Sequence, residues 1–588
     1  MRPGFLLFFL ILFSISHSQE NKYPQNYFRH PLNIPMEIVG NFGELRTNHW
    51  HMGLDIRTQQ KQNLPVYASA EGYISRVSIE PGGFGRTIYI NHPNGYTTVY
   101  AHLNNFEPRL HQYVKEQQYK LESWEADLVL PPSIFPVRKG DFIAYSGNTG
   151  ASAGPHVHFE IRKTANDKCV NPLLFGFPLA DNVLPSIIRL AMYDRTKSVY
   201  HQTPNFFSLK KLNRNYIIAK ENVIRTDSEK ISFAITAFDR LSGSNNPIGI
   251  YSARLLKDDE LLSEFLLDDI NYDETRYMNA HIDYRMKLSG GAYVQHLSKM
   301  PGDTSEVYSK GDGIIHLDDT LQHKISIQTL DHNSNISTLE FYVQKNDVPG
   351  KLYESTSSNQ MIPGQVNVFE TPDFELFTSE YSVYDTVHIS YSSTDVQLSN
   401  AISKRHSFSS HLISSHDFVT VRIKTFMQLT EEQKSKVVIL CISGNRKITQ
   451  KAQWNNGWVW AKFRNFGSFQ AYIDDTAPVI NSLGKGDTVN FYKGGRFVFT
   501  PTDNFNTIKN FRAELNGNWL MFTNDKGRSW VYSFDERLTV GIHELKILTE
   551  DVAGNITEKS WWIKYQDVVP KAKPKPKGKS KAKRKKSK

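Results

Sequence analysis

The stretch PVYASAEGYISRVSIEPGGFGRTIYINHPNGYTTVYAHL (residues 65–103) decides the fold of the first part of the chain. Short runs rich in Val, Ile, Tyr and Thr alternate with Gly, Pro and Asn, a pattern typical of short strands separated by turns. Asn94 and Gly95 lie between two such runs, and Asn-Gly is favoured in two-residue hairpin turns. We therefore predict a hairpin here, within an antiparallel sheet.

The strand pattern extends from about Pro35 to Pro178, with one interruption. The segment HQYVKEQQYKLESWEADL (residues 111–128) has helical composition, and strand patterns return at GDFIAYSG and HVHFEIRK. These observations predict a β-sheet domain over residues 19–180 with a helical insertion at about residues 104–136.

Strand patterns continue for most of the remaining chain, which predicts an all-β-dominated protein with β-sandwich modules at residues 181–350, 351–475 and 476–566. Two segments are alike, ISIQTLDHNSNISTLEFYVQ and LKILTEDVAGNITEKSWWIK. In each, an Asp and an Asn four residues later (Asp331 with Asn335, Asp551 with Asn555) are expected to cap the turn between two strands. A similar but weaker strand-turn-strand pattern surrounds Asp239. The last module resembles bacterial immunoglobulin-like domains, and DDTAPVI, beginning at Asp474, reads as the linker that enters it.

The N-terminus, MRPGFLLFFLILFSISHSQE, has the pattern of a secretory signal peptide over residues 1–18. The apolar run from Phe5 to Phe13 is too short for a stable membrane anchor, so we expect no transmembrane anchor in the mature protein. The sequence thus predicts export across the inner membrane, to the periplasm or cell envelope. The two cysteines, Cys169 and Cys441, are expected to be unpaired thiols, although a disulfide between them stays open.

The positive charge is concentrated at the C-terminus. The last eighteen residues hold eleven Lys and Arg, so removing them takes the formal net charge from +9 to −2. We therefore expect no nucleic-acid partner and a basic, disordered tail over residues 567–588. Such a tail suits binding to anionic envelope polymers, and a solubilising or translocation-related role stays open.

Two short segments of the first domain carry candidate metal ligands. HMGLD places His51 and Asp55 four residues apart, and HVH places His156 and His158 at the start of an apolar strand. Side chains two apart on a strand lie on the same face, so one imidazole can bind a metal while the other reaches the substrate.

Two further segments accompany these ligands. YAHL ends a predicted strand with His102, and SGNTGASAGP is a glycine-rich loop that leads into HVH. Zinc prefers nitrogen, sulfur and carboxylate ligands, and a catalytic zinc site has three protein ligands plus water. Two His and one Asp meet that count.

The order H-x-G-x-D, Y-x-H-L, S-G-N-T-G, H-x-H-F-E resembles the lysostaphin-like and LytM-like zinc endopeptidases, over about 140 residues. The resemblance implies that His51, Asp55 and His158 hold one Zn²⁺ per chain. His102 and His156 would then be the catalytic imidazoles, His156 mainly for proton transfer and His102 mainly for stabilising the oxyanion. The long insertion departs from the family and puts the substrate preference in doubt.

Three other residues are candidates for substrate binding. Arg46 could bind a substrate carboxylate or form a salt bridge within the domain, and Asn148 and Thr149 could contact substrate or only shape their loop. We expect Glu160 to be a packing or supporting group.

The leading functional hypothesis is a zinc metalloendopeptidase that hydrolyses the peptide cross-links of bacterial peptidoglycan, with D-alanyl to diamino-acid links as the expected target. A non-catalytic wall-binding or hydrolase-activating protein on the same fold is the alternative. A third interpretation makes the β modules the main function, as a surface adhesin or scaffold.

Overall fold

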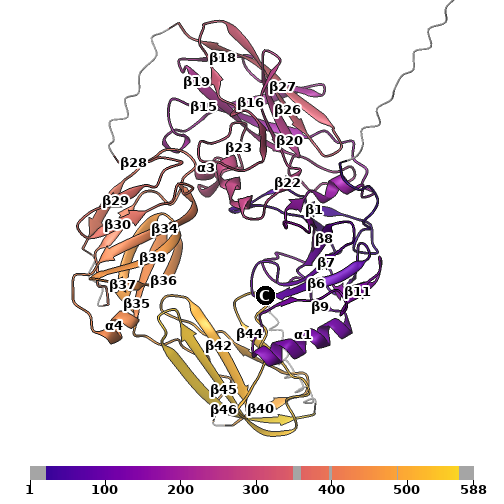
Figure 1. The fold of residues 1–588 in the computed structure, drawn as a ribbon, viewed down its shortest axis with the longest axis vertical. Helices are drawn as coiled ribbons and strands as arrows, with labels where there is room; N and C mark the ends of the chain where they lie inside the picture. The colour runs from indigo at the N-terminus through magenta and orange to yellow at the C-terminus, as the bar shows by residue number, and fades with distance from the viewer. Residues whose placement is uncertain (1–21, 348–358, 396–399, 487, 569–588) are drawn as a thin grey trace, which may run out of the picture.

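The computed structural model describes residues 22–347, 359–395, 400–486 and 488–568. The predicted signal peptide (residues 1–18) and the lysine-rich residues 569–588 of the predicted tail lie outside the described residues. Four β-rich parts follow one another around a ring, and the last returns to the first beside helix α1 (Figure 1). We call them the first domain (residues 22–180), the second module (181–347), the third module (359–475) and the last module (476–566).

The first domain is built on a mostly antiparallel sheet. Its predicted hairpin is confirmed, because the backbone turns at Gly95, where φ is 82°, between two strands paired in antiparallel register. A second, three-stranded sheet and a short ribbon complete the domain. The main sheet has the order β1 (Ile38–Gly40), β4 (Leu54–Arg57), β13 (His156–Lys163), β8 (Tyr96–Ala101), β7 (Arg86–Asn91), β6 (Gly72–Ile79) and β10 (Ala126–Val129), and β11 (Pro136–Val137) pairs with β6 and β14 (Cys169–Val170) with β13. The three-stranded sheet has the order β5 (Pro65–Tyr67), β12 (Phe142–Tyr145) and β9 (Asn105–Phe106). The ribbon pairs β2 (Leu45–Arg46) with β3 (His49–Trp50), and the 3-10 helix η1 spans Pro172–Phe175.

The insertion is only partly helical. Helix α1 spans Pro108–Leu121, and Glu107 caps its first turn by accepting hydrogen bonds from backbone N–H groups. The helix ends at Glu122, whose φ of 47° is left-handed. The prediction of helix up to Leu128 was therefore wrong at its end, because Ala126–Val129 pairs with β6 as an edge strand, an interaction that local composition does not encode.

The second module is a large sheet that folds over on itself. Phe233 and Phe341 meet inside it, with ring centroids 5.0 Å apart. One strand, β22 (Asp269–Ile270), leaves the module and pairs with β14 of the first domain. The remaining strands are β15 (Ser186–Asp194), β16 (Asn205–Leu212), β17 (Asn215–Ile218), β18 (Val223–Thr226), β19 (Lys230–Phe238), β20 (Ser252–Lys257), β21 (Glu260–Leu266), β23 (Gln295–His296), β24 (Tyr308–Lys310), β25 (Ile315–His316), β26 (Gln322–Leu330) and β27 (Ile336–Lys345), and the helices are η2 (Val199–His201), η3 (Glu274–Tyr277), α2 (Met278–His281) and α3 (Tyr284–Leu288).

The third module consists mainly of two five-stranded sheets. Phe463 and Phe469, one from each sheet, have ring centroids 5.2 Å apart, so the sheets share a core as in a sandwich. The first sheet has the order β29 (Val368–Glu370), β30 (Phe374–Phe377), β34 (Ser414–Lys424), β38 (Trp458–Asn465) and β37 (Gln453–Asn455), the second β32 (Tyr391–Thr394), β33 (Arg405–Phe408), β39 (Gly467–Ile473), β35 (Val437–Ser443) and β36 (Arg446–Lys451); β28 (Gln360–Met361) pairs with β31 (Val387–His388), and helix α4 is Glu431–Ser435.

The last module pairs a five-stranded sheet with a two-stranded one. Phe499 and Phe511 join them, with ring centroids 6.0 Å apart. The predicted caps of both repeated turns are confirmed, because the backbone N–H groups of Asn335 and Asn555 donate to Asp331 Oδ1 and Asp551 Oδ1, each at 2.8 Å. The five-stranded sheet of the last module has the order β40 (Thr488–Tyr492), β46 (Ile556–Gln566), β45 (Gly541–Asp551), β42 (Ile508–Leu515) and β43 (Asn518–Trp519). The two-stranded sheet pairs β41 (Arg496–Phe499) with β44 (Trp530–Ser533).

The parts of the chain are packed together rather than strung out. Trp50 of β3 is fully buried, its backbone N–H donates to Thr275 Oγ1 at 3.0 Å, and it belongs to one hydrophobic cluster with residues of the second and third modules. Cys169 and Cys441 are buried, unpaired thiols. Among the described residues, no helix combines the length and apolar character that crossing a membrane requires.

Candidate metal centre and substrate groove

Three neighbouring strands of the first domain bring the predicted histidines together. In the antiparallel register, His158 of β13 lies opposite Asp55 of β4 on one side and Ala101 of β8 on the other. His102 directly follows β8. The turn before β4 needs Gly53, because a Cβ there would come 2.4 Å from the carbonyl oxygen of Phe159. The H-x-G-x-D segment can therefore lie tightly against β13.

The three predicted ligands form a nearly equilateral triangle of donor atoms. His51 Nε2 lies 2.9 Å from Asp55 Oδ1 and 3.0 Å from His158 Nδ1, and His158 Nδ1 lies 3.1 Å from Asp55 Oδ1. In a tetrahedral zinc site with bonds of about 2.0–2.1 Å, neighbouring ligand atoms are roughly 3.3 Å apart. The residues present thus fit a zinc ion in donor type, number and spacing.

Hydrogen bonds on the outer side of each imidazole set its tautomer. His51 Nδ1 donates to the backbone carbonyl of Asn41 at 2.8 Å, and His158 Nε2 donates to Glu160 Oε1 at 2.8 Å. The opposite nitrogen of each ring is therefore the one that faces the centre and can bind a metal. Glu160 is in turn held by Arg162, whose Nε donates to Oε2 at 2.7 Å. This chain of buried contacts orients His158.

The charges of the site favour binding of a cation. Burial alone would raise the pKa of Asp55, but the adjacent His51, His156 and His158 hold it well below its ordinary value. Burial alone would lower the pKa of His158, but Asp55 and Glu160 raise it to about 9. Because a proton and a metal ion would compete for His158 Nδ1, metal binding at this centre would release a proton.

Two more imidazoles lie beside the triangle. His102 Nδ1 donates to the carbonyl of Thr149 at 2.9 Å, and His156 Nδ1 donates to that of Gly154 at 2.8 Å. The two ring centroids are 4.8 Å apart, and His156 Nε2 lies 3.3 Å from Asp55 Oδ1. Burial lowers the pKa of His102 to about 3, with His156 and His158 contributing, so this ring is neutral.

Comparison with known families identifies this part of the chain. Residues 49–119 and 135–172 match the model described as Peptidase family M23. The first domain is a peptidase family M23 domain. The unmatched residues between the two segments fall within the insertion. Residues 358–474, in the third module, match the model of a Zu5-like domain.

Curated relatives resemble the chain over the same part. An "Uncharacterized metalloprotease" of Haemophilus influenzae is 35% identical over 160 residues, which are 26% of this chain and 28% of the relative. A "DD-carboxypeptidase/endopeptidase Mpg" of Neisseria meningitidis is 34% identical over 134 residues, 23% of this chain and 24% of the relative. A "Murein hydrolase activator NlpD" of Salmonella typhimurium is 30% identical over 139 residues, 24% and 29%. The chain thus spans less than a third of the length of each.

The M23 centre lies in a groove of about 600 Å³. Most of the lining comes from the M23 domain, but Tyr272 belongs to the second module. Its ring lies 6.4 Å from that of Phe84, and the guanidinium of Arg162 lies 4.9 Å from its centroid. Phe84 in turn lies 5.3 Å from the ring of His158. A residue outside the M23 domain therefore forms part of the groove wall, which the sequence motifs did not indicate.

The glycine-rich loop that leads into β13 is held by the last module. Lys526 Nζ donates to the carbonyls of Gly150 at 3.2 Å and Ser152 at 2.8 Å. The backbone carbonyl of the neighbouring Asp525 accepts a hydrogen bond from the backbone N–H of Gly150 at 2.9 Å. The carboxylate of Asp525 forms an ion pair with Arg86 of the M23 domain at 2.9 Å. We call these contacts the Asp525–Lys526 clamp. Local sequence around residue 525 carries no signal for it.

The predicted substrate-binding residues are engaged in contacts within the protein. Arg46 Nη2 lies 3.0 Å from Asp55 Oδ2 and 3.3 Å from Glu44 Oε1, so it supports a metal ligand while lining the groove. Thr149 is buried, and its hydroxyl donates to the carbonyl of Leu103 at 2.9 Å. Asn148 Oδ1 accepts from Lys526 at 3.3 Å.

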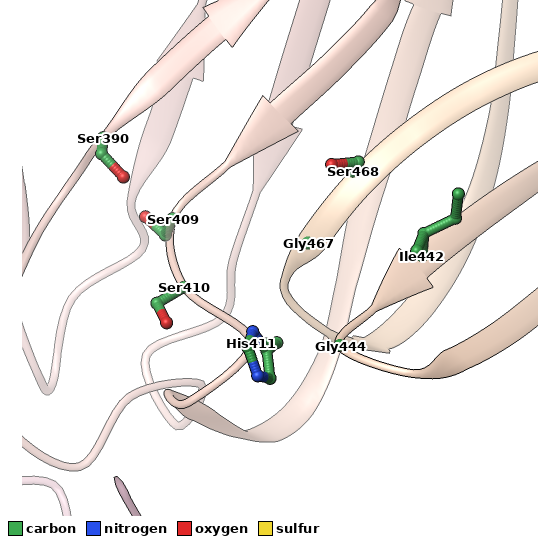
Figure 2. A pocket seen from close by; sticks show the side chains of 8 residues that line it. All are labelled: Ser390, Ser409, Ser410, His411, Ile442, Gly444, Gly467 and Ser468. Atoms are coloured by element: carbon green, nitrogen blue, oxygen red, sulfur yellow. The ribbon is translucent and has the colours of Figure 1, made fainter. Parts of the chain in front are cut away.

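A separate hollow of about 450 Å³ lies in the third module (Figure 2). Serine hydroxyls and the single imidazole of His411 line it, beside Gly444 and Gly467. Among its lining residues there is no carboxylate and no second imidazole, so it lacks the ligand set of the M23 groove.

Proposed function

We propose that the protein is a zinc-dependent endopeptidase that hydrolyses peptide cross-links of bacterial peptidoglycan in the cell envelope. The observation that carries the proposal is the complete set of five side chains: a ligand triangle with sides of 2.9, 3.0 and 3.1 Å and two imidazoles beside it. A purely structural cluster of histidines has no need for two further rings whose Nδ1 atoms are both fixed by backbone carbonyls.

Zinc, when bound by His51, Asp55 and His158, would polarise the scissile carbonyl and lower the pKa of a water molecule to about 7. His156 Nε2 is the proposed acceptor of the proton of the attacking water, because Nδ1 is fixed as the donor to Gly154. As the new C–O bond forms and the C–N bond breaks, His156 returns that proton to the leaving amine.

The role of His102 follows from its tautomer. With Nδ1 donating to Thr149, the neutral ring presents a lone pair at Nε2, so it cannot donate to an oxyanion until it gains a proton. The lowered pKa of about 3 opposes that gain. We therefore propose that the neutral His102 ring accepts a hydrogen bond at Nε2 from the attacking water and positions it, while His156 takes the proton.

The wall substrate is supported by the similarity to a relative named as a DD-carboxypeptidase/endopeptidase. A D-alanyl to diamino-acid link is the proposed bond. The test is mass analysis of fragments released from purified Gram-negative peptidoglycan by the full chain. We expect cross-linked dimers to be converted to monomers, conversion to stop with a strong chelator and to return with added zinc. Fragments that are the same with and without protein would contradict the proposal.

The second candidate function is activation of other wall hydrolases, favoured by the similarity to a murein hydrolase activator. A His158→Ala variant separates the two. If the protein is an enzyme, the variant releases no fragments from purified wall. If it is an activator, the variant and the wild-type protein are both inactive alone and both stimulate a purified wall amidase.

A further inference from the structure

Three carboxylates meet where the chain enters the second module. Asp181 lies in the connecting segment, Asp239 follows β19 and Asp331 follows β26, and one oxygen from each lies within 4.8 Å of the others. Asp239 and Asp331 are each 2% exposed. We call this set the first aspartate trio.

A second trio occupies the same place in the last module. Asp474 lies in the connecting segment, Asp503 follows β41 and Asp551 ends β45, again with one oxygen from each within 4.8 Å of the others. Asp474 and Asp551 are fully buried. The two trios are more than a hundred residues apart and belong to different modules.

The trios share their construction in detail. Asp181 and Asp474 each precede a proline by four residues, Pro185 and Pro478. Each accepts at Oδ1 from the backbone N–H two residues further on, at 3.1 and 3.3 Å. The side-chain amide of Asn335 or Asn555 donates both to the turn aspartate, at 2.6 and 2.7 Å, and to the backbone carbonyl of the linker aspartate, at 3.4 and 2.8 Å.

Each trio contains buried carboxylate oxygens without a hydrogen-bond partner. These atoms are Asp181 Oδ2 and Asp239 Oδ1 in the first trio, and Asp474 Oδ2 and Asp503 Oδ1 in the second. Buried polar atoms are rarely left unpaired, because losing water without a replacement costs about 1–3 kcal/mol, and more for a charged group. The unpaired oxygens therefore point to a ligand that the protein's own donors do not replace.

The cations near the trios act at longer range than an ion pair, as Lys451 does on Asp551 of the second trio. In the described part of the chain, none of the six carboxylates forms an ion pair within 4.0 Å of a Lys, Arg or His nitrogen. Arg240 is the cation that acts on Asp239, and its guanidinium lies over the ring of Phe238. A bound cation would offset the repulsion among the three crowded carboxylates.

We propose that each aspartate trio binds one calcium ion. All offered ligands are carboxylate oxygens, which a hard cation prefers, and zinc would prefer nitrogen or sulfur. Calcium accepts six to eight oxygens in flexible geometry, so three carboxylates with backbone carbonyls and water complete its shell. Magnesium requires near-ideal octahedral geometry and keeps several waters, for which buried oxygens leave little room.

The position of the linker aspartates gives the sites a role. Asp181 joins the M23 domain to the second module, and Asp474 joins the third module to the last. A calcium ion shared by a linker aspartate and two module aspartates ties each linker to its module. The two sites therefore fix the angles at two joints of the ring, one of which sets where the Asp525–Lys526 clamp meets the M23 domain.

Calcium uptake by the full chain tests the proposal. Bound metals are first removed from the protein, and one equivalent of zinc is then added back before calcium is titrated. Isothermal titration with calcium chloride should give two ions per chain, and saturation should raise the thermal unfolding temperature. Asp239→Asn and Asp503→Asn should each bind one ion, and the double variant none. Asn keeps the shape and removes the charge. If Asp239→Asn fails to fold, Asp181→Asn tests the first trio from its more exposed member.

Matched controls replace exposed aspartates outside the trios. Asp259→Asn in the second module and Asp475→Asn, next to Asp474, should keep two calcium ions per chain. The proposal is overturned if wild-type protein takes up no calcium at about 1 mM, the weak end of protein calcium sites. It is overturned equally if the double variant binds as wild type does, or if magnesium alone binds with the same stoichiometry and affinity. Zinc content reports separately on the M23 centre, so failure here leaves the proposed peptidase function untouched.

Discussion

The ligand triangle and the groove rim of this protein are built in opposite ways. Two members of the triangle come from one sheet, in which the register of β4 and β13 places Asp55 and His158 opposite each other, and His51 lies in the turn just before β4. The rim takes Tyr272 from the second module and the Asp525–Lys526 clamp from the last. Backbone hydrogen bonds fix the first arrangement, and side-chain contacts between modules fix the second.

We expect the ligand triangle to govern the chemical step, and the groove rim to govern how the substrate reaches it. A slip of one residue in the sheet register would turn every side chain to the other face, so the register fixes which side chains face the centre. Contacts such as the Lys526 bonds to two carbonyls are individually weak and can be lost without unfolding the M23 domain. We therefore expect substitutions in the triangle to abolish metal binding or turnover, and substitutions in the rim to change substrate handling only.

The largest expected effect separates the two histidines of β13. His158→Ala removes a metal ligand, so zinc affinity should fall by orders of magnitude and activity with it. His156→Ala leaves His51, Asp55 and His158 in place, so zinc should stay bound while turnover falls roughly 10²- to 10⁴-fold. Metal content and rate on both purified variants check this. Zinc loss in His156→Ala with retention in His158→Ala would reverse the ligand assignment.

The second-largest effect is expected at Glu160, which accepts the hydrogen bond from His158 Nε2. Glu160→Gln keeps an acceptor for His158 Nε2 but loses the negative charge that Arg162 stabilises. Zinc affinity should fall roughly 10- to 100-fold, as is usual for partners of metal-bound histidines. Competition with a chromophoric chelator measures this, and the exposed Glu71→Gln is the control. Unchanged affinity would mean that the sheet alone orients His158.

A smaller effect is expected at the clamp. Lys526→Ala should free the carbonyls of Gly150 and Ser152, so hydrogen exchange of the backbone amides in residues 146–155 should become faster. We expect kcat/KM to fall about 3- to 10-fold, because the loop is held less precisely, and the zinc content to stay unchanged. The exposed Arg528→Ala serves as the control. A rise in activity instead would show that the last module holds the groove closed, which would reverse the role assigned to the clamp.

The smallest effect is expected at Tyr272. Tyr272→Ala removes the ring that packs on Phe84 and Arg162, and Tyr272→Phe keeps it. We expect KM for wall fragments to rise a few-fold in the Ala variant alone, with kcat unchanged, because the residue lines the groove without touching the ligand atoms. A fall in kcat as large as that of His156→Ala would break the division between triangle and rim.

Several features could be predicted because they are encoded within a few residues. The Asn94-Gly95 hairpin and the Asp-x-x-x-Asn turns depend on local backbone preferences, and both are present. The end of the helical segment within the insertion was predicted wrongly, since β10 depends on pairing with β6, about fifty residues earlier. The glutamate that orients His158 had a usable signal, because it lies two residues further along the same strand.

The sequence by itself determined the β-rich class of the chain and the turn caps, and it supplied the five candidate side chains of the metal centre. The β-rich class and the turn caps depend on residue types at short, fixed spacing, and the five candidates rest on motifs that resemble a known family. Only the tertiary structure decided that Tyr272 and Lys526 reach the groove, and that Asp181 and Asp474 each join two aspartates of the module that follows. These contacts depend on how whole modules pack against one another, and no local pattern of residues carries that information.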